Sequence, residues 1–142
     1  MATFVVDASA TLPWCFADEA TDATNALLAR LKTGDAALVP GHWPAEVANA
    51  LLIAVRRGRI NLQDAQQFLE DLDALPIRID PTTPKLARLH IMPLAEKHML
   101  TIYDAAYLEL ALRQSVPLAT LDDDLRKAAI ASGVSLALLL QP

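Results

Sequence analysis

The stretch TFVVDAS at residues 3–9 decides the fold, because a short apolar run there ends abruptly in the carboxylate of Asp7. Branched and aromatic residues favour an extended backbone, so the first four residues of this stretch predict a strand. PLATLD at residues 117–122 repeats the pattern, with an apolar run followed by Asp122. Each of these two acids is therefore predicted to stand at the carboxyl end of a strand.

Short apolar runs alternate with longer stretches of helical periodicity along the chain, which predicts an α/β fold. Helices between the strands indicate a mostly parallel sheet of four to five strands, covered on both faces in an α/β/α arrangement. The predicted strands are residues 3–6, 36–39, 77–80, 117–120 and 134–139; the predicted helices are 9–16 and 19–32 with a break near Pro13, 43–57, 62–75 with Asn61 as N-cap, 83–98 with a kink at Pro93, 104–114, and 122–132.

The composition predicts one domain over residues 1–142, because 54% of the residues are apolar and the length suits a single core. The only cysteine, Cys15, excludes an intrachain disulfide, and we interpret it as a small apolar residue of the core or of an interface. The sequence has no apolar run of membrane-spanning length and no basic leader, so we expect a soluble, cytoplasmic protein without a membrane partner.

The net charge of −5 argues against a protein whose only task is to coat nucleic acid, because such proteins are basic. It is compatible with an enzyme whose acidic residues hold metal ions, since two divalent cations would change −5 to −1. The distribution of the acids along the chain is therefore more informative than their number.

Two further acids are predicted to lie at the same edge of the sheet as Asp7 and Asp122. Glu46 falls in the first turn of the helix that follows the second strand, and Asp104 opens the helix 104–114. Helices that follow parallel strands begin at the carboxyl edge, where open sheets bind their ligands. Four carboxylates gathered without a neutralising Lys or Arg would raise one another's pKa values, and Mg²⁺ or Mn²⁺ suits such a donor set.

Other polar residues near these acids have candidate supporting roles. The hydroxyls of Ser9 and Thr120 lie two residues from the acids at the strand ends, where they can hold a carboxylate or a metal-bound water. Asn49 shares a helix face with Glu46, and Asp124 is a candidate further ligand. Each acid taken alone also fits a helix cap or a first-turn position, but caps have no reason to gather at one edge.

Four motifs stand in order along the chain: VVDAS (5–9), PAEVANAL (44–51), TIYDAAYLELA (101–111) and LATLDDDL (118–125). Together they resemble the PIN-domain family, and within it the VapC-type toxin ribonucleases of type II toxin–antitoxin (VapBC) pairs. The resemblance covers essentially the whole chain. It implies a PIN-like α/β/α fold with a metal site at Asp7, Glu46, Asp104 and Asp122, a frequent fifth acid at Asp124, and supporting hydroxyls at Ser9 and Thr120.

The resemblance implies a metal-dependent endoribonuclease that uses one or two Mg²⁺ or Mn²⁺ ions and a metal-activated water to hydrolyse RNA. Such a toxin inhibits translation and growth until its VapB-type antitoxin neutralises it. A homodimer, and a larger hetero-oligomer with the antitoxin, are the implied assemblies. The alternative is a catalytically silent PIN-like domain that serves as a binding or scaffold module.

Two other α/β classes with acids at the sheet edge fit the sequence less well. A phosphoryl-accepting receiver domain requires paired acids after its first strand and a lysine after a late strand, whereas Asp7 is single and Lys127 falls within a predicted helix. A haloacid-dehalogenase-type phosphatase requires two acids one residue apart, and here Ser9 takes the second position.

The run Arg56, Arg57 and Arg59 is the densest basic segment of the chain. It lies at the far end of a helix of about 22 Å, so it is predicted to lie away from the acids. Contact with RNA phosphates, a cation-favouring helix C-terminus and contact with an acidic antitoxin segment all remain open for it.

Overall fold

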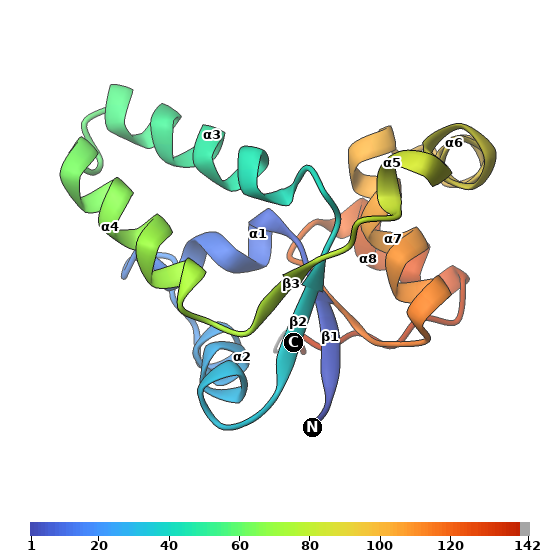
Figure 1. The fold of residues 1–142 in the computed structure, drawn as a ribbon, viewed down its shortest axis with the longest axis horizontal. Helices are drawn as coiled ribbons and strands as arrows, with labels where there is room; N and C mark the ends of the chain where they lie inside the picture. Colours follow the sequence, from blue (N-terminus) through green and yellow to red (C-terminus); the bar gives the residue numbers. More distant parts are fainter. Residues whose placement is uncertain (140–142) are drawn as a thin grey trace.

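The computed structural model describes residues 1–139, in which a parallel sheet separates two groups of helices (Figure 1). All neighbouring strands pair in parallel, in the order β3-β2-β1-β4. The registers place Val5 of the central strand opposite Leu38 on one side and Leu118 on the other. The strands are β1 (Thr3–Val6), β2 (Ala36–Val39), β3 (Ile77–Ile79) and β4 (Leu118–Ala119).

The helices divide between the two faces of the sheet according to the direction in which the chain crosses it (Figure 1). The chain moves outward from β1 to β3 and then returns past β1 to β4, and connections of one hand place these two passes on opposite faces. The first pass contains α1 (Ala8–Thr11), a 3₁₀ turn at Leu12–Trp14, α2 (Asp22–Lys32), α3 (Trp43–Arg56) and α4 (Leu62–Asp73); the return contains α5 (Thr83–Leu86), a π turn at Ala87–Ile91, α6 (Met92–His98), α7 (Ile102–Gln114), and then α8 (Asp123–Ala131) follows β4.

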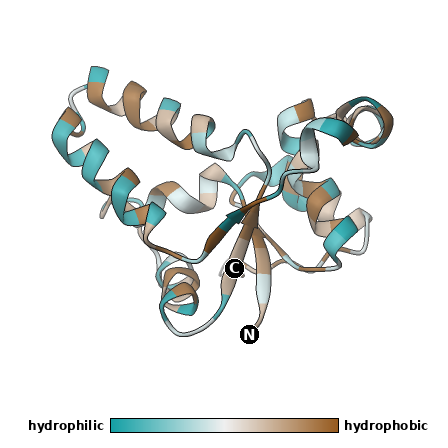
Figure 2. Ribbon diagram, viewed as in Figure 1, coloured by the Kyte–Doolittle hydropathy of each residue, from teal (hydrophilic) through white to brown (hydrophobic). Residues whose placement is uncertain are grey.

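The core lies where the strands meet α7, which is the most deeply buried helix. Its residues 105–111 are all buried, whereas α4 is largely polar and buries one narrow stripe (Figure 2). Phe4, Val5 and Val6 of β1 are completely buried, as expected for a central parallel strand. Within the described chain, no helix is both long enough and apolar enough to cross a membrane.

The predicted α/β/α class and the positions of the first four strands are confirmed, and two helix starts were predicted wrongly by two residues or more. The helix predicted at 19–32 begins at Asp22, because Thr21 and Thr24 form a reciprocal capping box there. The helix predicted at 104–114 begins at Ile102, because the Thr101 hydroxyl accepts a hydrogen bond from the Asp104 amide at 3.1 Å. Asp104 therefore lies inside the first turn and is not the cap.

Two other elements differ from their predicted form. The helix predicted at 83–98 is interrupted one turn before Pro93, at the π turn, because a proline has no amide hydrogen for the preceding turn and its ring crowds that turn. The last predicted strand, 134–139, is reduced to one bridge in the described chain, where Leu118 bonds to Ser135 and Ala137 at 2.9 Å each.

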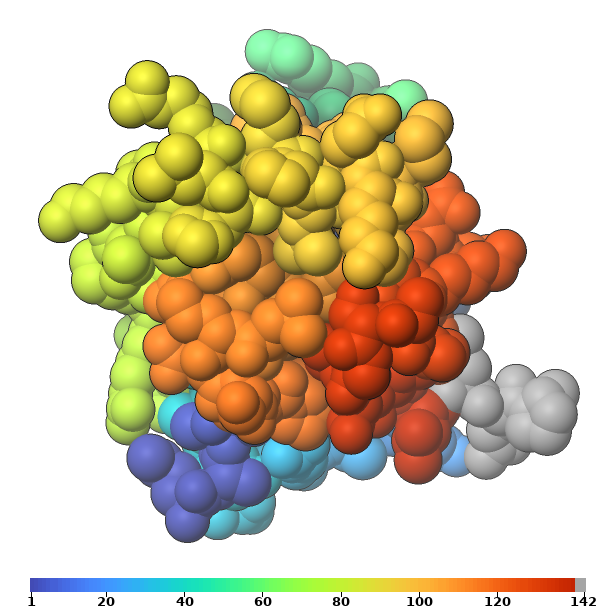
Figure 3. All heavy atoms as spheres, turned by 90° about the vertical axis from the view of Figure 1, so that its right-hand side faces the viewer, coloured from blue at the N-terminus to red at the C-terminus, as the bar shows by residue number. Residues whose placement is uncertain are grey.

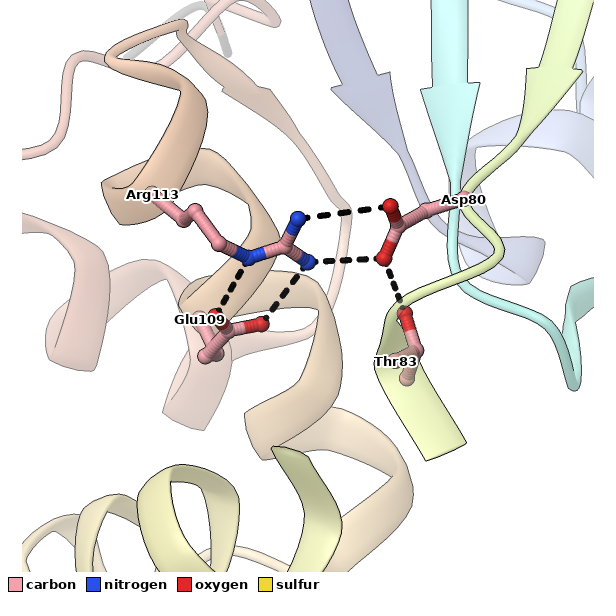
Figure 4. Close-up of polar contacts among 4 residues, drawn as sticks. All are labelled: Asp80, Thr83, Glu109 and Arg113. Atoms are coloured by element: carbon pink, nitrogen blue, oxygen red, sulfur yellow. Dashed lines mark hydrogen bonds and ion pairs between the residues drawn. The ribbon is translucent and has the colours of Figure 1, made fainter. Parts of the chain in front are cut away.

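An ionic cluster joins the end of β3 to α7 (Figure 4). Arg113 donates to Asp80 Oδ2 and to Glu109 Oε1, both at 2.7 Å, and the Thr83 hydroxyl also donates to Asp80. Burial of Asp80 favours its neutral form, but the hydrogen bonds from Arg113 and Thr83 outweigh it and hold the Asp80 pKa at about 2. The cluster therefore fixes the start of α5 against α7.

Candidate active site

Asp7 lies immediately after β1, where the chain turns into α1. The residue is 4% exposed, and its Oδ1 accepts hydrogen bonds from the Ser9 hydroxyl at 2.7 Å and the Ala10 amide at 3.0 Å. The Thr120 hydroxyl donates to Oδ2. The hydrogen bond from the Ala10 amide makes Asp7 the N-cap of α1. The same side chain is also a predicted site residue.

The two hydroxyls that hold Asp7 also tie β1 to the end of β4. Ser9 accepts a hydrogen bond from the Leu121 amide at 2.9 Å, and Thr120 accepts one from the Asp122 amide at 3.0 Å. Ser9 and Thr120 lie 3.3 Å apart. The structure therefore places both hydroxyls against the Asp7 carboxylate, at the point where the strand order reverses direction.

Asp122 is the N-cap of α8, and its Oδ1 accepts a hydrogen bond from the Leu125 amide at 2.8 Å. The residue is exposed, so its carboxylate faces solvent at the edge of the sheet. The helix-cap role that the sequence allowed for Asp122 is therefore correct, and its carboxylate still lies at the same edge of the sheet as Asp7.

Glu46 is held by a residue that the sequence analysis did not single out. The Tyr107 hydroxyl donates to Glu46 Oε1 at 2.8 Å and so links the start of α3 to α7. Tyr107 is completely buried, and burial together with the Glu46 charge raises its pKa, which keeps the hydroxyl protonated as a donor. A signal was present, because Tyr107 follows Asp104 by three residues and helical spacing places both on one face.

The four acids are close enough to perturb one another. Burial raises the pKa of Asp7 to about 6 against its three hydrogen bonds, with a further contribution from Glu46. Burial also raises the pKa of Asp104, and the charges of Asp122 and Glu46 add to the effect. In residues 1–139, no ion pair includes any of these acids. The cluster therefore carries uncompensated negative charge.

The chemistry of this donor set fits a hard divalent cation, because it is rich in oxygen, anionic and free of Lys or Arg partners in the described chain. As they stand, no three Asp, Glu, His or Cys side chains of residues 1–139 are arranged so that they already surround one ion. Repulsion among the acids favours an arrangement in which their carboxylates lie apart. Both oxygens of Asp7 accept hydrogen bonds from hydroxyl or amide donors.

The remaining predicted residues have no hydrogen bond to the four acids in the described chain, or they are already engaged elsewhere. Asn49, Asp124, Arg56 and Arg57 are exposed, and the described chain offers none of them a hydrogen bond to the four acids. Arg59 pairs with Asp18 at 3.1 Å and Glu19 at 3.0 Å and lies over the Phe16 ring, so its charge is used within the fold. Cys15 is half-buried against the core, and burial raises the pKa of its thiol.

The comparisons with known proteins identify the family of the chain. The PIN domain family model matches residues 4–131. The chain is 39% identical over 89 residues to "Ribonuclease VapC1" of Mycobacterium tuberculosis, an alignment that spans 63% of this chain and 65% of that relative. It is 32% identical over 124 residues to "Ribonuclease VapC12" of the same organism, across 87% of this chain and 90% of the relative.

A solved structure with low sequence identity shares the fold over almost its whole length. VapBC2 from Rickettsia felis, bound to a DNA fragment from its promoter, superposes with a TM-score of 0.62 at 13% identity and covers 98% of this chain and 97% of its own. The family model spans the segments in which the four acids lie. This chain belongs to the PIN-domain family.

Proposed function

We propose that the protein is a metal-dependent endoribonuclease and the toxin of a VapBC-type toxin–antitoxin pair. The observation that carries this proposal is the buried carboxylate of Asp7, which two hydroxyls hold beside three further acids that lack cationic partners. The names of the relatives VapC1 and VapC12 support the ribonuclease activity.

Asp7, Asp104 and Asp122 would hold one or two Mg²⁺ or Mn²⁺ ions, with Glu46 and Asp124 as further candidate ligands. A divalent cation bound there would stabilise the negative charge that develops on the phosphodiester during hydrolysis and would favour ionisation of the attacking water. It would also remove the repulsion among the acids, which is unfavourable without a cation.

The chain's own residues orient the acids for this task. Ser9 and Thr120 fix both oxygens of Asp7, and their bonds to the backbone after β4 keep that orientation tied to Asp122. Tyr107 fixes one oxygen of Glu46 and leaves the other available for a water or a ligand. These donors limit the reorganisation required when substrate arrives.

The proposed partners are an RNA substrate, a VapB-type antitoxin and a second copy of the chain, with a larger hetero-oligomer when the antitoxin is present. The relative VapBC2, whose name joins toxin and antitoxin, supports the antitoxin as a partner. A basic side chain of the antitoxin would find unpaired carboxylates at the sheet edge.

Cleavage of total bacterial RNA by the purified protein, freed of antitoxin, tests the proposal. We expect discrete fragments with Mg²⁺ or Mn²⁺, no fragments with EDTA, and no fragments from Asp7→Asn with either ion. Thermal unfolding of both proteins, with and without the ion, provides the control. The ion should raise the midpoint of the unaltered protein much more than that of the variant.

Failure of a folded, ion-stabilised protein to cleave RNA would contradict the ribonuclease. It would instead support the alternative, a silent binding or scaffold module. Cleavage by Asp7→Asn at the rate of the unaltered protein would also contradict the proposal, because the observation that carries it would then be irrelevant to the activity.

A further inference from the structure

A cavity of about 310 Å³ lies between the start of α7, the start of α3 and the segment from α5 through the π turn. Figure 3 shows that segment and α6 lying over α7 on this face of the molecule. The walls of the cavity are mostly apolar, and His42 and Tyr103 contribute aromatic rings to them. The volume is near the lower end of the roughly 300–1,000 Å³ typical of small-molecule sites.

The cavity adjoins the acid cluster through both aromatic residues. Tyr103 directly precedes Asp104, and His42 lies four residues before Glu46, just before α3. The His42 ring meets the edges of Tyr103 and Tyr107, with centroids 5.5 and 5.2 Å apart, and Tyr107 is the residue that holds Glu46. A group in the cavity would therefore lie beside a phosphate bound at the acids.

One residue that lines the cavity has a ring nitrogen whose hydrogen-bonding capacity is unused. His42 Nε2 is buried and has no hydrogen-bond partner among the described residues. A buried polar atom without a partner is costly, so such an atom indicates a missing bond. An occupant with an apolar face suits the apolar and aromatic walls, and polar atoms on its edge would offer His42 a partner.

The adjoining π turn adds an independent reason to expect binding here. Ala87 and Ile91, its first and last residues, both line the cavity. Single π turns inside helices are rare and are found frequently at functional sites. Tyr103 is 62% exposed, so its ring is accessible from solvent. Aromatic rings that solvent can reach are the usual platforms on which proteins stack unpaired bases of single-stranded RNA.

We propose that this cavity binds one unpaired base of the RNA substrate, next to the phosphate that is cleaved, and thereby sets the base preference of cleavage. This inference rests on the proposed ribonuclease activity. Tyr103 is assigned to stacking, His42 to a hydrogen bond with the base edge, and the apolar wall at Ala87 to the fit of the ring.

The test uses single-stranded oligoribonucleotides that differ only in the nucleotide on either side of the cleaved bond. We expect the unaltered protein to prefer one base at one of these positions. Ala87→Leu fills the cavity and Tyr103→Ala removes the stacking surface, so each should reduce that preference about tenfold.

Three controls separate recognition from folding. Tyr103→Phe keeps the ring and should keep the preference. Ala131→Leu makes the same addition as Ala87→Leu at an exposed position of α8 and should change nothing. All variants should retain the thermal midpoint of the unaltered protein within a few degrees, which excludes loss of structure as the cause.

The possible failures are distinguishable. Equal cleavage of all the oligonucleotides by the unaltered protein, or an unchanged preference in Ala87→Leu and Tyr103→Ala, would overturn the base site and leave the ribonuclease standing. Variants that keep the preference but lose binding of the antitoxin would assign the cavity to that partner instead. The absence of any cleavage by the unaltered protein would overturn the ribonuclease and the base site together.

Discussion

Asp7 and Asp80 occupy equivalent places in the sheet and have opposite environments. Each follows a parallel strand at the carboxyl edge, and the amide of each bonds to the neighbouring strand, to Ala119 at 3.1 Å and to Val39 at 2.8 Å. Asp80 meets the Arg113 guanidinium, and its pKa falls to about 2 (Figure 4). Asp7 has uncharged donors and another acid as neighbours but no cation, and burial raises its pKa to about 6.

The position of an acid at the sheet edge therefore does not decide its role. Arg113 supplies the positive charge that compensates Asp80, so this carboxylate has its ion-pair partner within the chain. The charge of Asp7 has no ion-pair partner in the described chain, and under the proposed function a bound cation would compensate it. Pairing thus separates an acid that holds the structure together from an acid available for chemistry.

Substituting an acid of the candidate site should slow RNA cleavage far more than substituting the paired acid Asp80. Asp122→Asn should lower the rate of RNA cleavage about a thousandfold, because a ligand of a catalytic cation contributes several kcal/mol to transition-state stabilisation. Asp80→Asn, made at the paired edge position, should leave the cleavage rate of the folded molecules unchanged. Rates on one oligoribonucleotide under single-turnover conditions measure both, and equal losses would contradict the distinction.

Replacing Arg113 removes the positive charge that Asp80 and Glu109 share and should destabilise the folded chain. Arg113→Met leaves Asp80 and Glu109 without a partner and should lower the free energy of unfolding by about 3 kcal/mol. Arg113→Lys, which keeps the charge but not the planar geometry, should lose less. Urea unfolding gives both values, and a loss under about 0.5 kcal/mol for the methionine variant would show that the cluster contributes little.

The unpaired carboxylate should make stability depend on pH in the opposite sense from a paired acid. The pKa of Asp7 is about 6 in the folded chain and ordinarily 3.8, so the folded state binds the proton more tightly. Stability in EDTA should therefore fall as pH rises from about 4 to about 6 and then level off, an effect of about 3 kcal/mol.

Subtraction isolates the contribution of Asp7 from those of the other titrating groups. The stability of Asp7→Asn minus that of the unaltered protein should increase over this pH interval, because the amide does not ionise. Urea unfolding in a series of buffers measures the difference. A flat difference would mean that the Asp7 carboxylate is not destabilised in the folded chain.

A smaller effect concerns the tyrosine that orients Glu46. Tyr107→Phe removes the hydroxyl donor and keeps the buried ring, so it should cost about 1.5 kcal/mol of stability. A freely rotating Glu46 should also slow cleavage about tenfold, since orientation is part of what the site supplies. Glu46→Gln serves as the comparison, and if the tyrosine acts through Glu46, the double variant should be no slower than Glu46→Gln alone.

The smallest expected effect applies the same comparison to positive residues. Arg57 has no ion pair in the described chain, whereas Arg59 is paired with two acids. Arg57→Gln should reduce the dependence of RNA binding on salt, lowering the slope of log K against log salt by about 0.7. Arg59→Gln should instead lower stability. An unchanged slope for Arg57→Gln would favour a helix-terminus role for the basic run.

Most of the fold could be predicted from short sequence patterns. Apolar runs placed the first four strands, and Asn61 was identified as a cap because its short polar side chain precedes a helical pattern. The errors lie at helix starts, where Thr21 and Thr101 compete as caps with neighbouring polar residues, and at Pro93, whose effect appears one turn earlier in the chain. The last predicted strand was also too long, since one bridge represents it in the described chain.

The acids illustrate what local patterns can and cannot decide. Asp7 and Asp122 were predicted to lie at one edge because each follows a strand, and the structure places them there with Ser9 and Thr120 between them. Asp80 also ends a predicted strand, and its pairing with Arg113 lies 33 residues further along the chain, beyond any local signal. The Tyr107 bond to Glu46 likewise joins residues 61 apart.

The sequence by itself determined the α/β class, the four candidate acids and the edge of the sheet at which they lie, because these depend on periodicity and on the direction of parallel strands. Only the tertiary structure decided which acids are paired, which tyrosine holds Glu46, and that a cavity with an unsatisfied histidine adjoins the cluster. Charge compensation and cavity shape depend on side chains that distant segments bring together, and local sequence carries no record of those distances.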